Sequence, residues 1–98
     1  MATLIKCNHD ILPKEDLIKV EPENKTNFNL NELYKLLLCD TIEVIYLNQN
    51  EIMIIDENGK LLGKPLNDTA THIYRKNIKN TRDYIVGHAL VCNTKQLK

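Results

Sequence analysis

The chain has 98 residues, and its 13 basic and 13 acidic side chains give a formal net charge of zero. This length suits one compact core, so we predict a single globular domain over residues 1–98. Zero net charge argues against a protein built around the phosphate backbone, where positive charge supplies most of the affinity. The three cysteines have no paired spacing. The chain also has no run of about 18 apolar residues, so we expect a reduced, cytoplasmic location without a membrane.

The first predicted elements are short strands. Residues 1–7 form either a strand or, together with the residues up to 15, a loosely ordered N-terminal arm. Residues 16–21 alternate better between polar and apolar side chains. Pro22 ends this segment, which is typical of an edge strand because proline cannot donate a hydrogen bond to a neighbour.

The clearest prediction is a helix over residues 30–39. Its apolar side chains recur at the spacing of one helical face, and they are Leu30, Leu33, Tyr34, Leu37 and Leu38. Asn29 precedes the stripe as an N-cap, and Glu32 three residues later completes a capping box. We expect this helix to cover one face of a sheet and to have a structural role.

Residues 41–63 predict a β-meander at the centre of the sheet. The strand over 42–47 is largely apolar on both faces, and the run 52–55 is continuously apolar, so both strands are predicted to be central or covered on both sides. The Asn-Gly pair at 58–59 predicts a tight hairpin turn, because both central residues of such a turn need positive φ. Residues 61–63 then lead back along a third strand.

A second helix is predicted over residues 67–75, followed by a polar, basic loop over 76–83. Residues 84–92 predict an interior strand, in which Gly87 marks a bulge or a close backbone approach. Residues 93–98 form a tail. The order of elements therefore predicts an α+β domain with a mainly antiparallel β-sheet.

A set of short motifs lies between residues 33 and 91. They are Ile42-Glu43-Val44, Asp56-Glu57-Asn58-Gly59, Pro65-Leu66-Asn67, Ala70-Thr71 and Ile85-Val86-Gly87. In these motifs the chain resembles the family catalogued as domain of unknown function 3846, whose members usually carry Gly-Gly where this chain has Cys39-Asp40. The resemblance implies a protein of phages, plasmids or other mobile elements without an established activity. It supplies no catalytic residues.

The start of the second helix is a candidate ligand site, because free backbone N–H groups at a helix N-terminus can hold anions. The residues considered for this site are Asn67, Thr69, Thr71 and His72, with Glu43 as a further candidate. Asp68 in the first turn would repel an anion, and capping alone explains Asn67. Glu43 would have a raised pKa if it were buried, whereas exposure at a sheet edge is the alternative.

An enzyme is an alternative that we do not favour, and we predict no catalytic residues. It would require Glu43, His72 and His88 to converge in one pocket. The chain contains no serine, so a serine nucleophile is excluded. A cysteine nucleophile would need one of the three thiols, Cys7, Cys39 or Cys92, beside a histidine. Only the fold decides whether such a pair exists.

Our leading hypothesis is a small non-enzymatic accessory protein of a phage or mobile element that binds a host protein or a small ligand. Weak nucleic-acid binding is a further alternative, and its candidate residues are Arg75, Lys76, Lys79 and Arg82. We expect no cofactor and no metal, because the cysteine and histidine spacings match no standard zinc site. Sheet edges leave a homodimer open.

Overall fold

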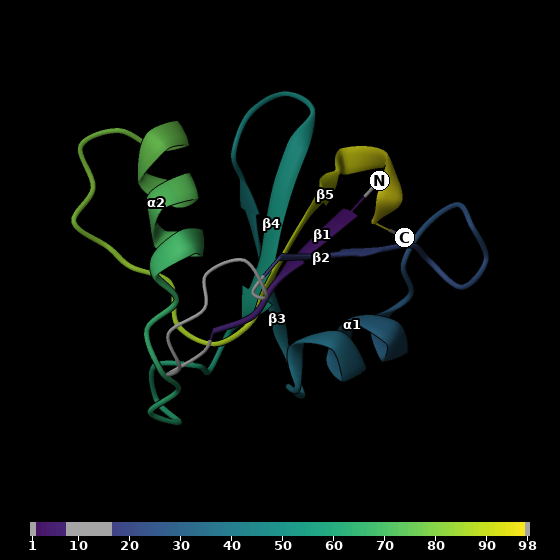
Figure 1. Cartoon of the computed structure of the whole chain (residues 1–98), viewed down its shortest axis with the longest axis horizontal. Helices are drawn as coiled ribbons and strands as arrows, with labels where there is room; N and C mark the ends of the chain where they lie inside the picture. Colours follow the sequence, from purple (N-terminus) through teal and green to yellow (C-terminus); the bar gives the residue numbers. More distant parts are fainter. Residues whose placement is uncertain (1, 8–16, 98) are drawn as a thin grey trace.

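The computed structural model describes residues 2–7 and 17–97. In this part of the chain the strands are β1 (Ala2–Ile5), β2 (Leu17–Val20), β3 (Ile42–Tyr46), β4 (Glu51–Asp56) and β5 (Ala89–Asn93). The helices are α1 (Leu30–Leu37), α2 (Asp68–Asn77) and the 3-10 turn η2 (Thr94–Gln96). The strands form one antiparallel sheet in the order β2-β1-β5-β4-β3 (Figure 1). This confirms the predicted α+β fold.

The sheet separates two apolar layers, with α1 on one side and α2 on the other (Figure 1). Successive side chains of a strand point to opposite faces. On β4, Ile52 and Ile54 therefore pack with α1, whereas Met53 and Ile55 pack with α2. Strand β4 is covered on both faces, as its continuous apolar sequence predicts.

Helix α1 begins and packs as the sequence predicts. Asn29 Oδ1 accepts the N–H of Glu32 at 2.9 Å, and the Glu32 side chain accepts the N–H of Asn29 at 3.2 Å. These two bonds form the predicted capping box. Within the predicted stripe, Leu33 and Leu37 are fully buried, whereas Leu38 ends the helix in a left-handed conformation and is exposed. The buried face is therefore narrower than the stripe.

The predicted third strand of the meander is wrong. Residues 57–63 form a series of turns, and neither residue of the pair at 58–59 has positive φ. Instead, Asp56 Oδ1 accepts the N–H of Asn58 at 2.9 Å, which turns the chain away from the sheet. Both edges of β4 are already paired, with β3 on one side and β5 on the other. No place beside β4 is left for a third consecutive strand.

Strand β3 lies at an edge of the sheet, so the prediction that it is central is also wrong. Its two faces are covered only in part: Val44 and Ile45 are half-buried, and Glu43 and Tyr46 are exposed. Among the described residues, β3 pairs with β4 alone. No strand from residues 2–7 or 17–97 borders the outer edge of β3.

The two ends of the chain contribute to the fold. Strand β1 lies between β2 and β5, so Ala2–Ile5 belong to the sheet rather than to a loose arm. The rest of that predicted arm, residues 8–15, lies outside the described residues. The predicted tail contains η2, and Leu97 forms a parallel bridge with Phe28. No helix in the described ranges is long and apolar enough to cross a bilayer.

The last strand is shorter than predicted, because residues 84–88 approach the sheet with a single bridge between Val86 and Leu66. Gly87 has a φ of 74°, and a Cβ there would lie 3.0 Å from the Lys64 side chain. A larger residue would meet both backbone strain and this contact. A close contact at Gly87 is present, but Gly87 lies before β5 and not inside a strand, and its close neighbour is the Lys64 side chain.

Candidate functional site

The start of α2 is a structural junction. Asn67 is 2% exposed, and its Oδ1 accepts the N–H of Ala70 at 3.0 Å. Its Nδ2 donates to the carbonyl oxygens of Ile5 at 3.0 Å and Gly87 at 2.8 Å. Both amide hydrogens are therefore used. Asn67 joins α2, the end of β1 and the segment that leads into β5.

Further bonds hold α2 against the same segment. Thr71 Oγ1 accepts the N–H of Ile85 at 2.9 Å and lies 3.3 Å from the Ile85 carbonyl oxygen. The Asn67 N–H donates to that carbonyl at 2.8 Å, and the Gly87 N–H donates to the Pro65 carbonyl at 2.8 Å. The polar groups of Asn67 and Thr71 are thus used in hydrogen bonds inside the protein. These bonds give both ligand candidates a structural role.

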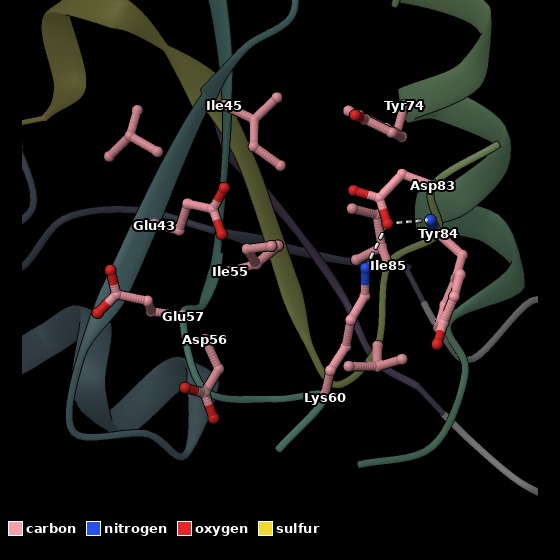
Figure 2. Close-up of a pocket in the computed structure, with 12 residues that line it drawn as sticks. Glu43, Ile45, Ile55, Asp56, Glu57, Lys60, Tyr74, Asp83, Tyr84 and Ile85 are labelled. Atoms are coloured by element: carbon pink, nitrogen blue, oxygen red, sulfur yellow. Dashed lines mark hydrogen bonds and ion pairs between the residues drawn. The ribbon is translucent and has the colours of Figure 1, made fainter. Parts of the chain in front are cut away.

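An acidic pocket of about 300 Å³ opens where the cover provided by α2 ends (Figure 2). Its polar lining, which we use to define it, consists of Glu43, Asp56, Glu57, Lys60, Tyr74, Asp83 and Tyr84. These residues come from β3, the end of β4 and the turn after it, α2 and the segment before β5. Ile45 and Ile55 of the sheet form an apolar wall. Figure 2 shows Glu43 and Lys60 extending from opposite sides toward the pocket.

One wall of the acidic pocket already holds a cation. The Lys60 ammonium pairs with Asp83, and it lies 4.3 Å from the centroid of the Tyr84 ring (Figure 2). The hydrogen bond with Asp83 raises the pKa of Lys60, and the same bond lowers the pKa of Asp83. The contacts of Lys60 show that a carboxylate next to an aromatic ring binds an ammonium group at this site.

The opposite wall carries two carboxylates that are in no ion pair with a described side chain, although the charge of Glu43 contributes to the raised pKa of Lys60. Glu43 and Glu57 are both exposed, so the sheet-edge alternative for Glu43 holds. Within residues 2–7 and 17–97, neither carboxylate forms a hydrogen bond or an ion pair. The pocket therefore has room and charge for a further cation.

Asp56 lines the same pocket, but its charge is compensated inside the protein. Asp56 is 4% exposed, and its Oδ2 lies 2.7 Å from Lys64 Nζ. Lys64 Nζ also donates to the Leu38 carbonyl at 2.8 Å. A cation at this position satisfies carbonyl groups at the C-terminal end of α1. The Asp56–Lys64 pair thus joins the end of β4 to α1.

A second, apolar pocket of about 280 Å³ is lined by Leu37, Leu38, Pro65 and Gly87, with Cys7, Lys64 and His88. The Cys7 N–H donates to His88 Nδ1 at 3.2 Å, and Cys7 Sγ lies 3.5 Å from the same nitrogen. A cysteine therefore does lie beside a histidine. Cys7 and His88 are 81 residues apart in sequence, so spacing alone could not pair them.

His88 is expected to make the stability of the fold depend on pH. Burial, and then the charges of Lys6 and Lys64, lower the pKa of His88 below its ordinary 6.5. Between the two pKa values the unfolded chain binds more protons than the folded one, so stability falls as pH falls below about 6.5. Above that pH, neutral His88 makes its full contribution to the stability of the fold. A protonated Nδ1 could not accept the Cys7 N–H.

The check is thermal unfolding of the wild-type chain and His88→Gln between about pH 7.5 and about pH 5. The variant should be the less stable protein at neutral pH, and the difference between the two melting temperatures should narrow on acidification. A difference that stays constant over this range would contradict the assignment to His88.

A family model described as Domain of unknown function (DUF3846) matches residues 10–97. The chain belongs to this family. No curated protein and no solved structure matches it. In this DUF3846 chain, the motifs Pro65-Leu66-Asn67, Ala70-Thr71 and Ile85-Val86-Gly87 build the junction under α2. They hold the fold together at that point.

The fold does not bring the proposed enzyme residues into one of these pockets. Glu43 lines the acidic pocket and His88 lines the apolar one. His72 is exposed on α2 and lines neither, and Thr69 beside it is half-buried and also lines neither. A ligand site at Thr69 and His72 stays a prediction. The described ranges contain no group of three metal-ligating side chains.

The basic residues lie on the last turn of α2 and the loop that follows. Arg75 donates to the carbonyl oxygens of Asp83 at 2.9 Å and Arg82 at 3.0 Å, so its guanidinium fastens the loop. Lys76, Lys79 and Arg82 are exposed, and nucleic-acid binding by this DUF3846 chain stays a prediction. Sequence reasoning missed Lys60 and Asp83. The sequence signal for Asp83 was that it is the one acidic residue in the basic loop over residues 76–83.

Proposed function

We propose that this DUF3846 chain is a binding module. It takes a cationic side chain of a partner protein into the acidic pocket, while an extended segment of that partner lies along the outer edge of β3. The observation that carries the proposal is the position of Glu43 on an edge strand, where a carboxylate that is in no ion pair with a described residue faces a pocket. A protein partner can satisfy both the carboxylate and the strand edge.

The pocket offers two kinds of contact to a lysine or arginine. Glu43 and Glu57 supply carboxylates, and charge-assisted hydrogen bonds to carboxylates are stronger than neutral ones. Tyr74 and Tyr84 supply aromatic surface, on which a guanidinium stacks well. The contact between Lys60 and Tyr84 is an internal example of the same chemistry.

Strand β3 suits the addition of a further strand. Its sequence, Ile42–Tyr46, contains no lysine and no proline, which are common guards against pairing at sheet edges. Main-chain hydrogen bonds give affinity in this recognition mode, and alternate side chains give specificity. Since side chains alternate along both strands, a partner residue opposite Glu43 would point to the face that carries the pocket.

We propose a host protein as the partner, in the cytoplasm of the host cell. The reason is the resemblance to this family, which implies a phage or another mobile element as the source. A non-enzymatic role fits a pocket whose polar groups include a neutralised Lys60–Asp83 pair and exposed carboxylates.

Replacing Glu43 by lysine is expected to weaken binding of cationic strands about tenfold or more, because it puts like charge into the pocket. The probe is an extended peptide of alternating valine and threonine with a central arginine, and the measurement is fluorescence anisotropy at low and moderate salt. Glu21→Lys is the matched control, because Glu21 is exposed and does not line the acidic pocket. Lys60→Met should strengthen binding, because it removes the competing ammonium.

The same experiment can reject the proposal. A peptide with a central glutamate that binds as well as the arginine peptide would show that the pocket does not select cations. Amide chemical shifts of residues 42–46 that do not move on titration would exclude pairing with β3. A pull-down from host lysate with wild-type and Glu43→Lys baits then identifies partners that depend on this side chain.

A second copy of the chain is the competing occupant of the β3 edge. Antiparallel pairing of two β3 strands about Val44 would put Glu43 opposite Ile45 of the other copy, so no like charges would face each other directly. Light scattering at high protein concentration separates the two cases. A dimer that dissociates when the arginine peptide binds would show that both use one edge.

A further inference from the structure

The pairing of β1 with β5 places a thiol next to an imidazole. Ile5 lies opposite Ala89 in the sheet, so the chain just after β1 runs beside the chain just before β5. Cys7 Sγ therefore reaches within 3.5 Å of His88 Nδ1, at the rim of the apolar pocket. This pair shares no lining residue with the acidic pocket and does not depend on the function proposed above.

The three cysteines of the chain occupy different environments. Cys92 is 2% exposed, and burial raises its pKa to about 11. Burial, and then the charge of Asp56, raise the pKa of Cys39 above its ordinary value. Both environments disfavour the thiolate, which is the nucleophilic form. Cys7 is only half-buried and has a histidine in contact.

Two lysines lie near the Cys7–His88 pair. Lys6 precedes Cys7 in the chain, Lys64 lines the same pocket as Cys7, and positive charges beside a thiol stabilise its thiolate. Asp56 is the carboxylate paired with Lys64, and it offsets part of that charge. His88 Nδ1 accepts the backbone N–H of Cys7, which directs its lone pair toward this residue. The same nitrogen lies 3.5 Å from Cys7 Sγ, so the imidazole also faces the thiol, and taking up the thiol proton at Nδ1 replaces the bond from the Cys7 N–H.

We propose that Cys7 is the nucleophilic thiol of this chain, that His88 accepts its proton, and that the adjoining apolar pocket admits a small, neutral disulfide. In the reaction, Cys7 Sγ attacks one sulfur of the disulfide as its proton passes to His88 Nδ1. A new S–S bond to Cys7 forms and the S–S bond of the reagent breaks. The leaving thiolate takes the proton from His88. One disulfide is consumed, and one mixed disulfide and one thiol are formed, so no other oxidant is needed.

The test compares single-thiol proteins. One combines Cys39→Ser with Cys92→Ala and keeps Cys7, and the other combines Cys7→Ser with Cys92→Ala and keeps Cys39. Each reacts with dithiodipyridine, a neutral aromatic disulfide, and its rate at pH 7 is divided by the rate of the same protein in denaturant. The normalised rate of Cys7 should exceed that of Cys39 about tenfold or more. Equal normalised rates would overturn the proposal.

The role of His88 is tested in the Cys7-only protein. His88→Gln should slow the reaction about fivefold or more, because it removes the proton acceptor. A rate that does not change would leave exposure as the sole reason for reactivity and would overturn the assignment.

If circular dichroism shows that His88→Gln is unfolded, the pH dependence of the rate in the Cys7-only protein decides. Its midpoint should lie below about 8.5, the value of an ordinary thiol, and a midpoint at or above that value would overturn the role of His88.

The apolar pocket makes a separate prediction about the reagent. We compare the rate of Cys7 with the neutral disulfide to its rate with a dianionic disulfide such as dithiobis-nitrobenzoate. The ratio of the neutral to the dianionic rate should be higher in the folded protein than in denaturant. The Lys6 and Lys64 charges by themselves would favour the anion, so the order of the two reagents separates apolar binding from electrostatic attraction. A preference for the anionic reagent would overturn the assignment of the pocket.

Discussion

Replacing Asn67 by alanine is expected to destabilise the fold by about 3–7 kcal/mol, enough to unfold a marginally stable domain at moderate temperature. The substitution removes the N-cap of α2, which contributes about 1 kcal/mol. It also leaves the carbonyl oxygens of Ile5 and Gly87 without their donor, and each unsatisfied buried group costs about 1–3 kcal/mol. Chemical denaturation followed by circular dichroism measures the loss.

The chain provides its own control for this substitution. Asn29 also caps a helix with its side-chain oxygen, but its amide nitrogen makes no bond to a buried carbonyl in the described part of the chain. Asn29→Ala should cost only about 1 kcal/mol. Asn67→Asp keeps the cap but sets a carboxylate against two carbonyl oxygens, so it should not rescue stability. Equal losses for Asn29→Ala and Asn67→Ala would show that Asn67 acts only as a cap.

Lys64→Met should cost about 3–5 kcal/mol, because it leaves the charge of Asp56 buried without a cation. The Asp56 side chain is 2% exposed and that of Lys64 is 19% exposed, so water compensates little of this charge. The carbonyl of Leu38 at the end of α1 also loses its donor. The measurement is again the free energy of unfolding. A loss below about 1 kcal/mol would mean that the pair contributes no more than a surface ion pair.

A double-mutant cycle isolates the pair. Combining Asp56→Asn with Lys64→Met removes both charges, and we expect the double variant to be more stable than Lys64→Met alone. Lys60→Met is the matched control, since Lys60 is also paired with an aspartate but lies at the surface. Its effect on stability should be within about 1 kcal/mol. A double variant no more stable than Lys64→Met would locate the loss in packing instead of charge.

The elements that were predicted correctly depend on contacts close in sequence. The capping box of α1 joins residues three apart, and Asn67 likewise caps α2 through Ala70 three residues on. The β3–β4 hairpin pairs neighbouring segments, and the continuous apolar run of β4 predicts burial on both faces. Such local patterns are present in the sequence itself, because helix caps and side-chain periodicity need no distant partner.

One error concerns strand pairing distant in sequence, and the other concerns hydrogen bonds within a turn. The apolar strand β3 was predicted to be central or covered on both sides, but β5 pairs with the far side of β4 and β3 lies at the edge with its faces covered only in part. The turn at 58–59 was predicted as a hairpin, but bonds from Asp56 to the following residues redirect the chain. Long-range strand pairing decided the first case and hydrogen bonds to Asp56 within the turn decided the second, and sequence periodicity treats the alternatives alike.

By itself, therefore, the sequence determined the helices with their caps, the buried character of β4 and the α+β class, because these follow from periodicity and short-range hydrogen bonding. Only the tertiary structure decided that Glu43 is exposed beside a pocket, that Asp56 is neutralised by Lys64, and that Cys7 meets His88. Each of these depends on which strands pair and how the chain turns between them. That choice is made by the packing of the whole core, and no single segment encodes it.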